Sequence, residues 1–289
     1  MPNIAVMERT SWRLDAGDDL VPGIQVERKL GGGERYEAFL GWDERLFAPV
    51  VVKVVRPHLV SDRATLEGLR REEHLLRGLA HPVVVRCFGS ELEGGRPHLV
   101  LEQLDGPRLS SLLRRHGPLA MEQLLPLGLE ICAALHYLRI QHVVHLDIKP
   151  SNIIMGAPPR LIDFSIARSV QEAAALRHVT GTDAYLAPEQ ADPDGREAPG
   201  PAADIWGLGA TLYEALCGEQ PFVSGDRSES VRPPELPSRV PAVVATPVMS
   251  CLAPSAADRP TPAELAGELE PLVAALPRPV LGGLRARIS

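Results

Sequence analysis

Residues 143–165 read VVHLDIKPSNIIMGAPPRLIDFS, a stretch in which short apolar pairs alternate with polar and turn-forming residues. Apolar runs bounded by turn residues are typical of strands, and a polar loop held between strands can fix side chains that need a particular placement. Carboxylate and amide oxygens are ligands for Mg2+, and an ammonium group suits phosphoryl oxygens. The stretch therefore predicts a metal- and phosphate-binding site built from Asp147, Lys149, Asn152 and Asp163.

The composition is that of an ordinary soluble globular protein, with 45% hydrophobic and 23% charged residues over 289 positions. A formal net charge of −7 argues against nucleic acid as a partner, because nucleic-acid-binding surfaces are basic. The four cysteines form no C-x-x-C pair and indicate reduced thiols rather than a zinc site or disulfides. The first residues do not resemble a signal peptide, and no run reaches the ~20 apolar residues of a membrane span. We therefore expect a cytoplasmic protein without a membrane span.

The motifs HLDIKPSN (145–152) and DFS (163–165) resemble the catalytic loop and the metal-binding motif of the Hanks-type, eukaryotic-like serine/threonine protein kinases of bacteria. Each motif alone has a simple structural explanation, such as a turn aspartate or a loop amide. The resemblance depends on order, because the motifs of that family follow one another from about residue 24 to 275. It implies an α+β, bilobal fold, with an N-lobe of five antiparallel strands and one helix and a larger, mainly helical C-lobe. On this resemblance the chain divides into an N-terminal arm (1–22), the N-lobe (23–103), the C-lobe (104–276) and a C-terminal tail (277–289).

The alternation in 24–30 predicts a half-exposed strand that runs into Gly31-Gly32-Gly33. A glycine-rich turn lets backbone N–H groups approach phosphates, although three glycines also suit a plain hairpin. In the G-x-G-x-x-G pattern of the resembling family, Gly31 and Gly33 match, and Tyr36 stands where the third glycine belongs. We expect that this departure weakens the cover of the phosphates by the loop.

Lys53 lies within a valine-rich strand pattern, 48–55, where an unpaired buried ammonium would be costly. The lysine therefore either points outward from an edge strand or has an anionic partner. The helical pattern at 61–79 offers two neighbouring candidates, Glu72 and Glu73. The spacing in the resembling family selects Glu72 and leaves Glu73 solvated.

Residues 98–106, HLVLEQLDG, resemble the strand and hinge that hold adenine in the same family. The likeness makes Leu101 the gatekeeper and assigns base recognition to backbone groups of Glu102 and Leu104. Ala38 and Val51 would cover one face of the purine and Ile154 the other. All of these apolar positions suit an ordinary hydrophobic core equally well.

The C-terminal part begins with helical patterns at 109–116 and 121–141, followed by residues 166–179 without a strong period. The resemblance identifies 163–189 as the activation segment, with Thr180 and Thr182 near its end. It also implies three structural roles. Asp204 caps backbone N–H groups of the catalytic loop, His145 supports that loop, and Glu189 of the A-P-E motif forms a buried salt bridge with Arg259.

The reaction that the resemblance implies is phosphoryl transfer from ATP, with Mg2+, to a protein hydroxyl. It assigns the α- and β-phosphates to Lys53, positioned by Glu72, and Mg2+ to Asn152 and Asp163. It assigns the proton of the substrate hydroxyl to Asp147. Protein substrates and regulatory proteins are the partners it implies, and it leaves the oligomeric state open.

Lys149, two residues after Asp147, would steady the γ-phosphate, and Thr182 beside Asp147 is typical of the serine/threonine class. Two further departures concern control rather than chemistry. Leu146 replaces the arginine of H-R-D, a non-RD pattern, so we expect activity independent of phosphorylation at Thr180. Ser165 replaces the glycine of D-F-G, which restricts the backbone there without touching the metal ligand.

Two other functions compete with protein phosphorylation. A pseudokinase scaffold would keep the fold and bind partners without efficient catalysis, and the altered glycine loop favours it. A small-molecule kinase is disfavoured, because A-P-E, D-x-W-x-x-G and Thr182 are features of kinases that act on proteins.

Overall fold

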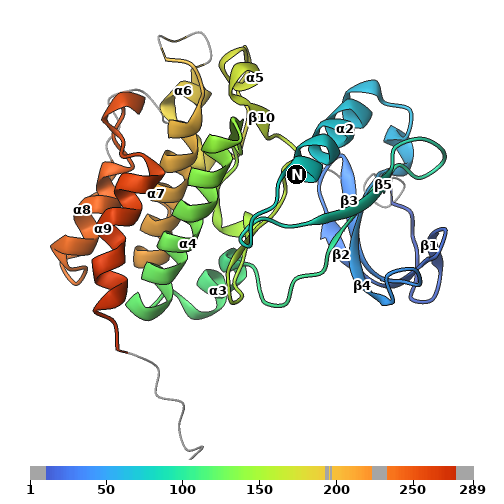
Figure 1. Ribbon diagram of the computed structural model, residues 1–289, viewed down its shortest axis with the longest axis horizontal. Coiled ribbons are helices and arrows are strands. Elements are labelled where there is room, and N and C mark those ends of the chain that lie inside the picture. The colour runs from blue at the N-terminus through green and yellow to red at the C-terminus, as the bar shows by residue number, and fades with distance from the viewer. Residues whose placement is uncertain (1–10, 193–194, 196, 223–232, 278–289) are drawn as a thin grey trace, which may run out of the picture.

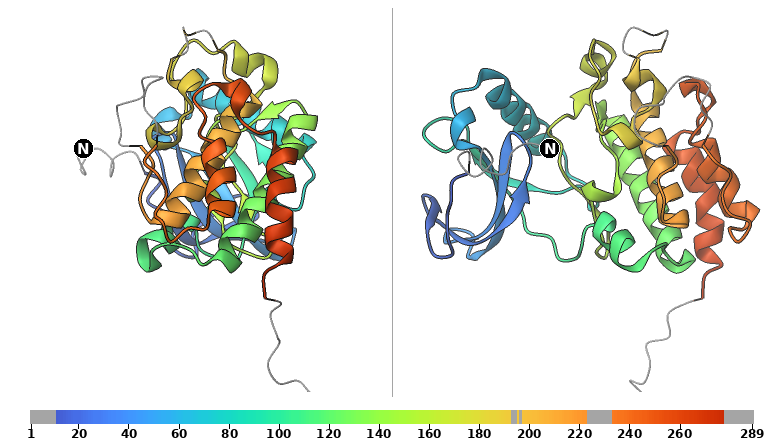
Figure 2. Two further views of the ribbon diagram at one scale, coloured as in Figure 1. Left: turned by 90° about the vertical axis from the view of Figure 1, so that its left-hand side faces the viewer. Right: turned by 180° about the vertical axis from the view of Figure 1, so that it is seen from behind.

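The computed structural model describes residues 11–192, 195, 197–222 and 233–277. Two lobes lie side by side, a β-sheet with one long helix and a larger group of helices (Figure 1). Seen from behind, the same separation is clear, with short strands and loops between the two parts (Figure 2). This is the α+β, bilobal architecture that the motif order predicted.

The sheet of the small lobe is antiparallel and has the strand order β1-β2-β3-β4-β6-β5. Its strands are β1 (Asp19–Val21), β2 (Ile24–Gly32), β3 (Tyr36–Asp43), β4 (Ala48–Val55), β5 (Cys87–Glu91) and β6 (His98–Glu102). The sequence predicted five strands, and the sixth is β1, which falls in the stretch expected to be an extended arm. Leu20 and Val21 account for the difference, because both side chains are buried and β1 pairs with β2. Residues 1–10 of the predicted arm lie outside the described residues.

The two faces of β4 have different surroundings, which resolves the position of its lysine. Val50, Val52 and Val54 are fully buried in a small outer core of the lobe. Val51 and Lys53 alternate with them and therefore lie on the inner face. Lys53 is paired with Ala38 on β3, and Val51 with Leu101 on β6, so these four residues share that face.

Helix α2 (Arg63–Gly78) lies beside the sheet and carries a buried stripe. Its N-cap is Asp62, whose carboxylate accepts a hydrogen bond from the Thr65 backbone nitrogen at 2.8 Å. The buried positions follow helical spacing, and three of them, Thr65, Gly68 and Glu72, are not large apolar residues; the other two are Leu69 and Leu76. One buried carboxylate thus points from α2 towards the sheet.

The large lobe packs its helices around α4 (Met121–Ile140), which contacts α7 (Pro201–Cys217) and α9 (Pro262–Ala274). Beside them lie α3 (Leu109–His116), α6 (Pro188–Ala191) and α8 (Ala242–Ser250). Thr261 caps α9 by accepting a hydrogen bond from the Glu264 backbone nitrogen. None of the helices in the described part of the chain is long and apolar enough to cross a membrane.

The remaining elements are short, and several of them carry or flank the polar residues of interest. They are β7 (Val143–Val144), β8 (Ile153–Ile154), β9 (Arg160–Leu161), β10 (Arg168–Ser169) and α5 (Val170–Ala174), with 3-10 turns at Pro57–Leu59, Pro150–Asn152, Asp183–Tyr185 and Ala256–Asp258. Strand β5 begins at Cys87, and the three valines before Arg86 lie outside it. Residues Val83–Val85 are instead buried against Leu161, with which they exchange backbone hydrogen bonds.

Candidate active site

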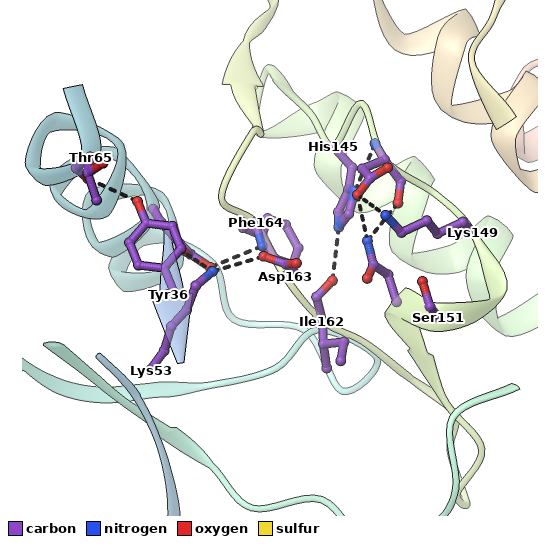
Figure 3. A network of polar contacts seen from close by, with 12 residues as sticks. Tyr36, Lys53, Thr65, His145, Lys149, Ser151, Ile162, Asp163 and Phe164 are labelled. Atoms are coloured by element: carbon purple, nitrogen blue, oxygen red, sulfur yellow. Dashed lines mark hydrogen bonds and ion pairs between the residues drawn. The ribbon is translucent and has the colours of Figure 1, made fainter. Parts of the chain in front are cut away.

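Lys53 lies between two carboxylates that come from different parts of the chain. Its ammonium nitrogen is 2.9 and 2.7 Å from the two carboxylate oxygens of Glu72 and 2.9 Å from Oδ1 of Asp163 (Figure 3). Glu72 is therefore the partner of Lys53, as the family spacing selected. The neighbouring Glu73 accepts a hydrogen bond from Ser90 and pairs with Arg77 instead.

The two carboxylates fix the charge of this lysine. Burial by itself lowers the pKa of Lys53, but the nearby Asp163 and Glu72 outweigh it and raise the pKa above the ordinary value. Burial likewise raises the pKa of Asp163, and the ammonium of Lys53 reverses this and holds that pKa well below its usual range. At neutral pH the site thus contains an ammonium group and an ionised aspartate in direct contact.

Glu72 also joins α2 to the segment that follows Asp163. The backbone nitrogen of Phe164 donates to Oε1 of Glu72 at 3.2 Å, and the Phe164 ring is fully buried. The ring of His145 meets it edge-on, with 4.6 Å between the ring centroids. Contacts therefore run from α2 through Phe164 to the loop that contains Asp147.

His145 is buried and neutral, because burial lowers the pKa of its imidazole. Its Nδ1 accepts from the backbone nitrogen of Asp147 at 3.3 Å, so Nε2 carries the proton and faces the carbonyl of Ile162, also at 3.3 Å. The imidazole thus connects the loops that carry the two aspartates, which fits the predicted supporting position of His145.

The carboxylate of Asp147 is surrounded by donors. Thr182 donates to Oδ1 at 2.7 Å, and Lys149 and Asn152 donate to Oδ2 at 2.7 and 2.9 Å. Lys149 is also hydrogen-bonded to the Thr182 hydroxyl. The structure therefore brings together four residues that the sequence singled out, across 35 positions of the chain.

Asp204, on α7, fixes the backbone of the loop that carries Asp147. Its carboxylate accepts from the backbone nitrogens of His145 and Leu146 at 2.8 and 2.7 Å, which is the predicted cap. Leu146 adopts a left-handed conformation, with φ of 67°, and the cap holds it there. Burial raises the pKa of Asp204 to about 7, although the two backbone donors oppose this.

The Glu189–Arg259 salt bridge predicted from the sequence is present and buried. The guanidinium makes two parallel bonds to the carboxylate, at 2.7 and 2.8 Å. Arg259 also donates to three backbone carbonyls and lies over the ring of Trp206, 5.0 Å from its centroid.

The residues proposed for adenine come from both lobes. Ala38, Val51 and Leu101 share the inner face of the sheet, and Ile154 lies on β8 of the large lobe. Glu102, the expected hinge residue, is held by its backbone and by its side chain. Its backbone nitrogen donates to the Arg86 carbonyl, and its carboxylate pairs with Arg160. Leu104 follows on the connection to α3, half-buried.

The glycine turn is closed by local bonds. The backbone nitrogen of Gly33 donates to the Tyr36 carbonyl at 3.0 Å, and the side chain of Arg56 donates to the Gly33 carbonyl at 2.7 Å. Gly31 has a φ of 146°, a conformation that few residues other than glycine adopt. The turn is thus a hairpin of defined shape.

Asn152 and Asp163 offer the donor set that Mg2+ prefers. The amide nitrogen of Asn152 donates to the backbone and side chain of Asp147, at 3.0 and 2.9 Å, which leaves the amide oxygen as its remaining acceptor. Asp163 is ionised and half-exposed. Two hard oxygen donors of this kind fit a magnesium ion whose other ligands are water and phosphate.

Two residues of the site were not anticipated in their observed roles. Gln190 donates from Nε2 to the carbonyls of Leu146 and Thr180, both at 2.9 Å, and so ties the end of the activation segment to the catalytic loop. Tyr36 turns inward and contacts Lys53 and α2 rather than opening the glycine turn. A signal for Tyr36 existed, since it precedes Ala38 by two residues and must share its face.

Comparison with known proteins gives a consistent picture. Residues 24–267 match the family described as "Protein kinase domain". The chain is 36% identical over 211 residues to the serine/threonine-protein kinase PknB of Mycobacterium leprae, which covers 70% of this chain and 33% of that protein. It is 35% identical over 229 residues to the serine/threonine-protein kinase PkaA of Streptomyces coelicolor, covering 75% of this chain and 42% of the relative. The chain thus spans about a third to two fifths of the length of these relatives.

Proposed function

This chain belongs to the protein kinase family, and from that premise we propose that it transfers the γ-phosphoryl group of ATP to a serine or threonine hydroxyl of a protein. The observation that carries the proposal is the position of Lys53, bonded at once to Glu72 of α2 and to Asp163. This ion pair must be in place for protein kinases to act, and here Lys53 and Glu72 form it.

Lys53 would contact the α- and β-phosphates of ATP, with Glu72 fixing its direction. Asp163 and the amide oxygen of Asn152 would hold Mg2+, which neutralises charge on the phosphates when it is bound. Gly31 and Gly33 would approach the phosphates through their backbone. The base would lie between the aliphatic side chains of the sheet and Ile154, with its edge at the backbone of Glu102 and Leu104.

Asp147 would receive the proton of the substrate hydroxyl and orient that hydroxyl for attack. Thr182 bonds its Oδ1 and Lys149 its Oδ2, and these two contacts fix the plane of the carboxylate. Lys149 would steady the γ-phosphate during transfer. The Thr182 contact to Asp147 supports serine and threonine as the acceptor residues.

The test is a comparison of wild-type protein with Asp147→Asn and Asp147→Ala. We expect ADP release and phosphate incorporation into a generic basic protein to fall at least about 100-fold in both variants, because general-base catalysis contributes roughly 10²–10⁴-fold. Asp258→Asn, which changes an exposed aspartate of the large lobe, serves as the matched control. Equal incorporation by wild type and Asp147→Asn would favour a scaffold without catalysis.

We further propose protein substrates in the cytoplasm, with regulatory proteins as additional partners. All four cysteines are free thiols, which suits a reducing compartment. Wild-type protein is added to one cytosolic extract and the Asp147→Asn variant to another. Proteins that incorporate phosphate only with wild type are candidate substrates.

A further inference from the structure

Tyr36 lies where the sheet, the glycine turn and α2 meet. It is the first residue of β3 and pairs with Val55, while Ala38, two residues later, pairs with Lys53. Side chains two apart on a strand share a face, and cross-strand partners share it as well. Tyr36 therefore points to the same side as Lys53, towards α2, as Figure 3 shows.

The tyrosine makes two separate contacts there. Its hydroxyl donates to the backbone carbonyl of Thr65, in the first turn of α2, at 2.9 Å. The ammonium of Lys53 lies over its ring, 4.8 Å from the centroid, within the range of a cation–π interaction. One side chain thus contacts both the helix that carries Glu72 and the lysine that Glu72 binds.

Helix α2 has a space that fits this phenol. Gly68 is buried in the helix interior, where glycine is less favourable than alanine. A Cβ atom at position 68 would meet the Tyr36 hydroxyl oxygen at 3.1 Å, closer than ordinary van der Waals contact. The absence of a side chain at Gly68 therefore leaves room for the tyrosine hydroxyl.

We propose that Tyr36 is a positioning residue that holds α2 and Lys53 in the arrangement in which the Lys53–Glu72 pair forms. The ring directs the ammonium and the hydroxyl anchors the helix. This inference rests on the proposed function only in taking Lys53 as the phosphate-binding lysine. It is an alternative to the sequence expectation that Tyr36 weakens the cover of the phosphates.

Two measurements test the positioning without requiring kinase activity. The first is hydrogen exchange of the α2 amides, and the second is the rate at which a lysine-directed acylating reagent modifies Lys53, read by mass spectrometry. Tyr36→Phe keeps the ring and loses the hydroxyl, so it should speed amide exchange in 65–72 by about 3- to 10-fold, the value of one hydrogen bond, and leave Lys53 labelling nearly unchanged. Tyr36→Leu should raise both. Tyr213→Phe, a buried tyrosine of α7, is the control and should change neither.

Gly68→Ala separates positioning from stability. Alanine favours the helix, so the thermal midpoint should stay level or rise, while exchange in 65–72 rises because the added methyl displaces the hydroxyl. Gly78→Ala makes the same substitution at the end of the same helix, where a Cβ would meet nothing within 4 Å, and should leave exchange in 65–72 unchanged. In a Tyr36→Phe background the effect of Gly68→Ala on exchange should shrink, because the hydroxyl oxygen is no longer there.

Steady-state kinetics then connect the inference to the reaction. We expect kcat/KM for ATP to fall about 3- to 10-fold in Tyr36→Phe and further in Tyr36→Leu.

Unchanged exchange and unchanged Lys53 labelling in Tyr36→Leu would overturn the inference, whether or not the protein is active. Tighter ATP binding by Tyr36→Leu would also overturn it, since the ring would then be blocking the phosphates. An inactive wild-type protein whose Tyr36 variants still show faster exchange would refute only the proposed function.

Discussion

Arg259 shows how much of the large lobe depends on a single side chain. Its guanidinium satisfies Glu189 and three carbonyls in a buried position, so neither charge of the pair has access to water as an alternative partner. Removal of one partner from such a pair leaves an uncompensated charge, which typically costs about 3–5 kcal/mol. The ion pair therefore fixes the end of the activation segment to the segment that precedes α9.

We expect Glu189→Ala and Arg259→Ala each to lower the free energy of unfolding by about 3–5 kcal/mol, as measured by urea denaturation. The double variant should lose less than the sum of the two, because it leaves no single charge buried. Arg259→Lys should resemble Arg259→Ala more than wild type, since an ammonium cannot make the paired bonds. Additive losses in the double variant would contradict this account.

Asp204 gives stability a defined dependence on pH. Burial raises its pKa to about 7 in the folded chain, against an unfolded value near 3.9. Between these values the folded state holds a proton that the unfolded state has released. Folding stability from this group is therefore fully present below about pH 4 and is lost as the pH rises through 7.

Asp204→Asn removes this titration and isolates its effect. The stability of wild type relative to the variant should fall as the pH rises from 4.5 to 7.5, measured by denaturation at each pH, and level off above. Other titrating groups are common to both proteins and cancel in the difference. A difference that stays constant over this range would show that Asp204 does not titrate there.

At the scale of elements, the side-chain amide of Gln190 holds the end of the activation segment. Leu146 occupies the place of the arginine that meets a phosphate in related kinases, and its side chain is buried. Gln190 instead bonds the carbonyls of Leu146 and Thr180. The Thr180 contact uses its backbone, so its hydroxyl is not needed for it.

Thr180→Ala should therefore retain ATP turnover within about twofold of wild type. Gln190→Met should reduce ATP turnover about tenfold or more, because it removes two hydrogen bonds worth about 1 kcal/mol each. ATP turnover is measured for each variant, and thermal midpoints equal to that of wild type show that the variant is folded. Gln171→Met, at an exposed position in α5, is the control. Loss of turnover in folded Thr180→Ala would mean that phosphorylation or the hydroxyl is required after all.

Sequence patterns differed in how well they anticipated individual elements. Helices α3 and α4 follow from their apolar spacing almost to the residue. Helix α5 was not predicted, because its five residues are too few to show a helical period. Its only sequence signal is the capping box formed by Ser169 and Glu172. The glycine motif did not predict the inward direction of Tyr36, because that direction depends on the strand face that Tyr36 shares with Ala38.

For the whole molecule, motif order was enough to predict two lobes, because each motif belongs to a known element and the elements have a fixed sequence. The resemblance to the family also implied the choice of Glu72 over Glu73 and the Glu189–Arg259 pair, and both contacts are present. The spacing of residues along the sequence could not predict which distant segments pack together. Strand β1 exists because Leu20 and Val21 find a core made by residues far along the chain, and no local period announces it.

The N-terminal segment has a consequence for where this domain starts. Trp12 donates from its indole nitrogen to the Val55 carbonyl at 2.8 Å and lies under the guanidinium of Arg96, while Ser11 bonds the buried Glu37. Residues 11–21 thus cover the outer core, yet the family match begins only at residue 24. A protein truncated at the family boundary would expose that core to water. The packed small lobe accordingly extends upstream of the residues that match the family, and burial places its start at or before Ser11.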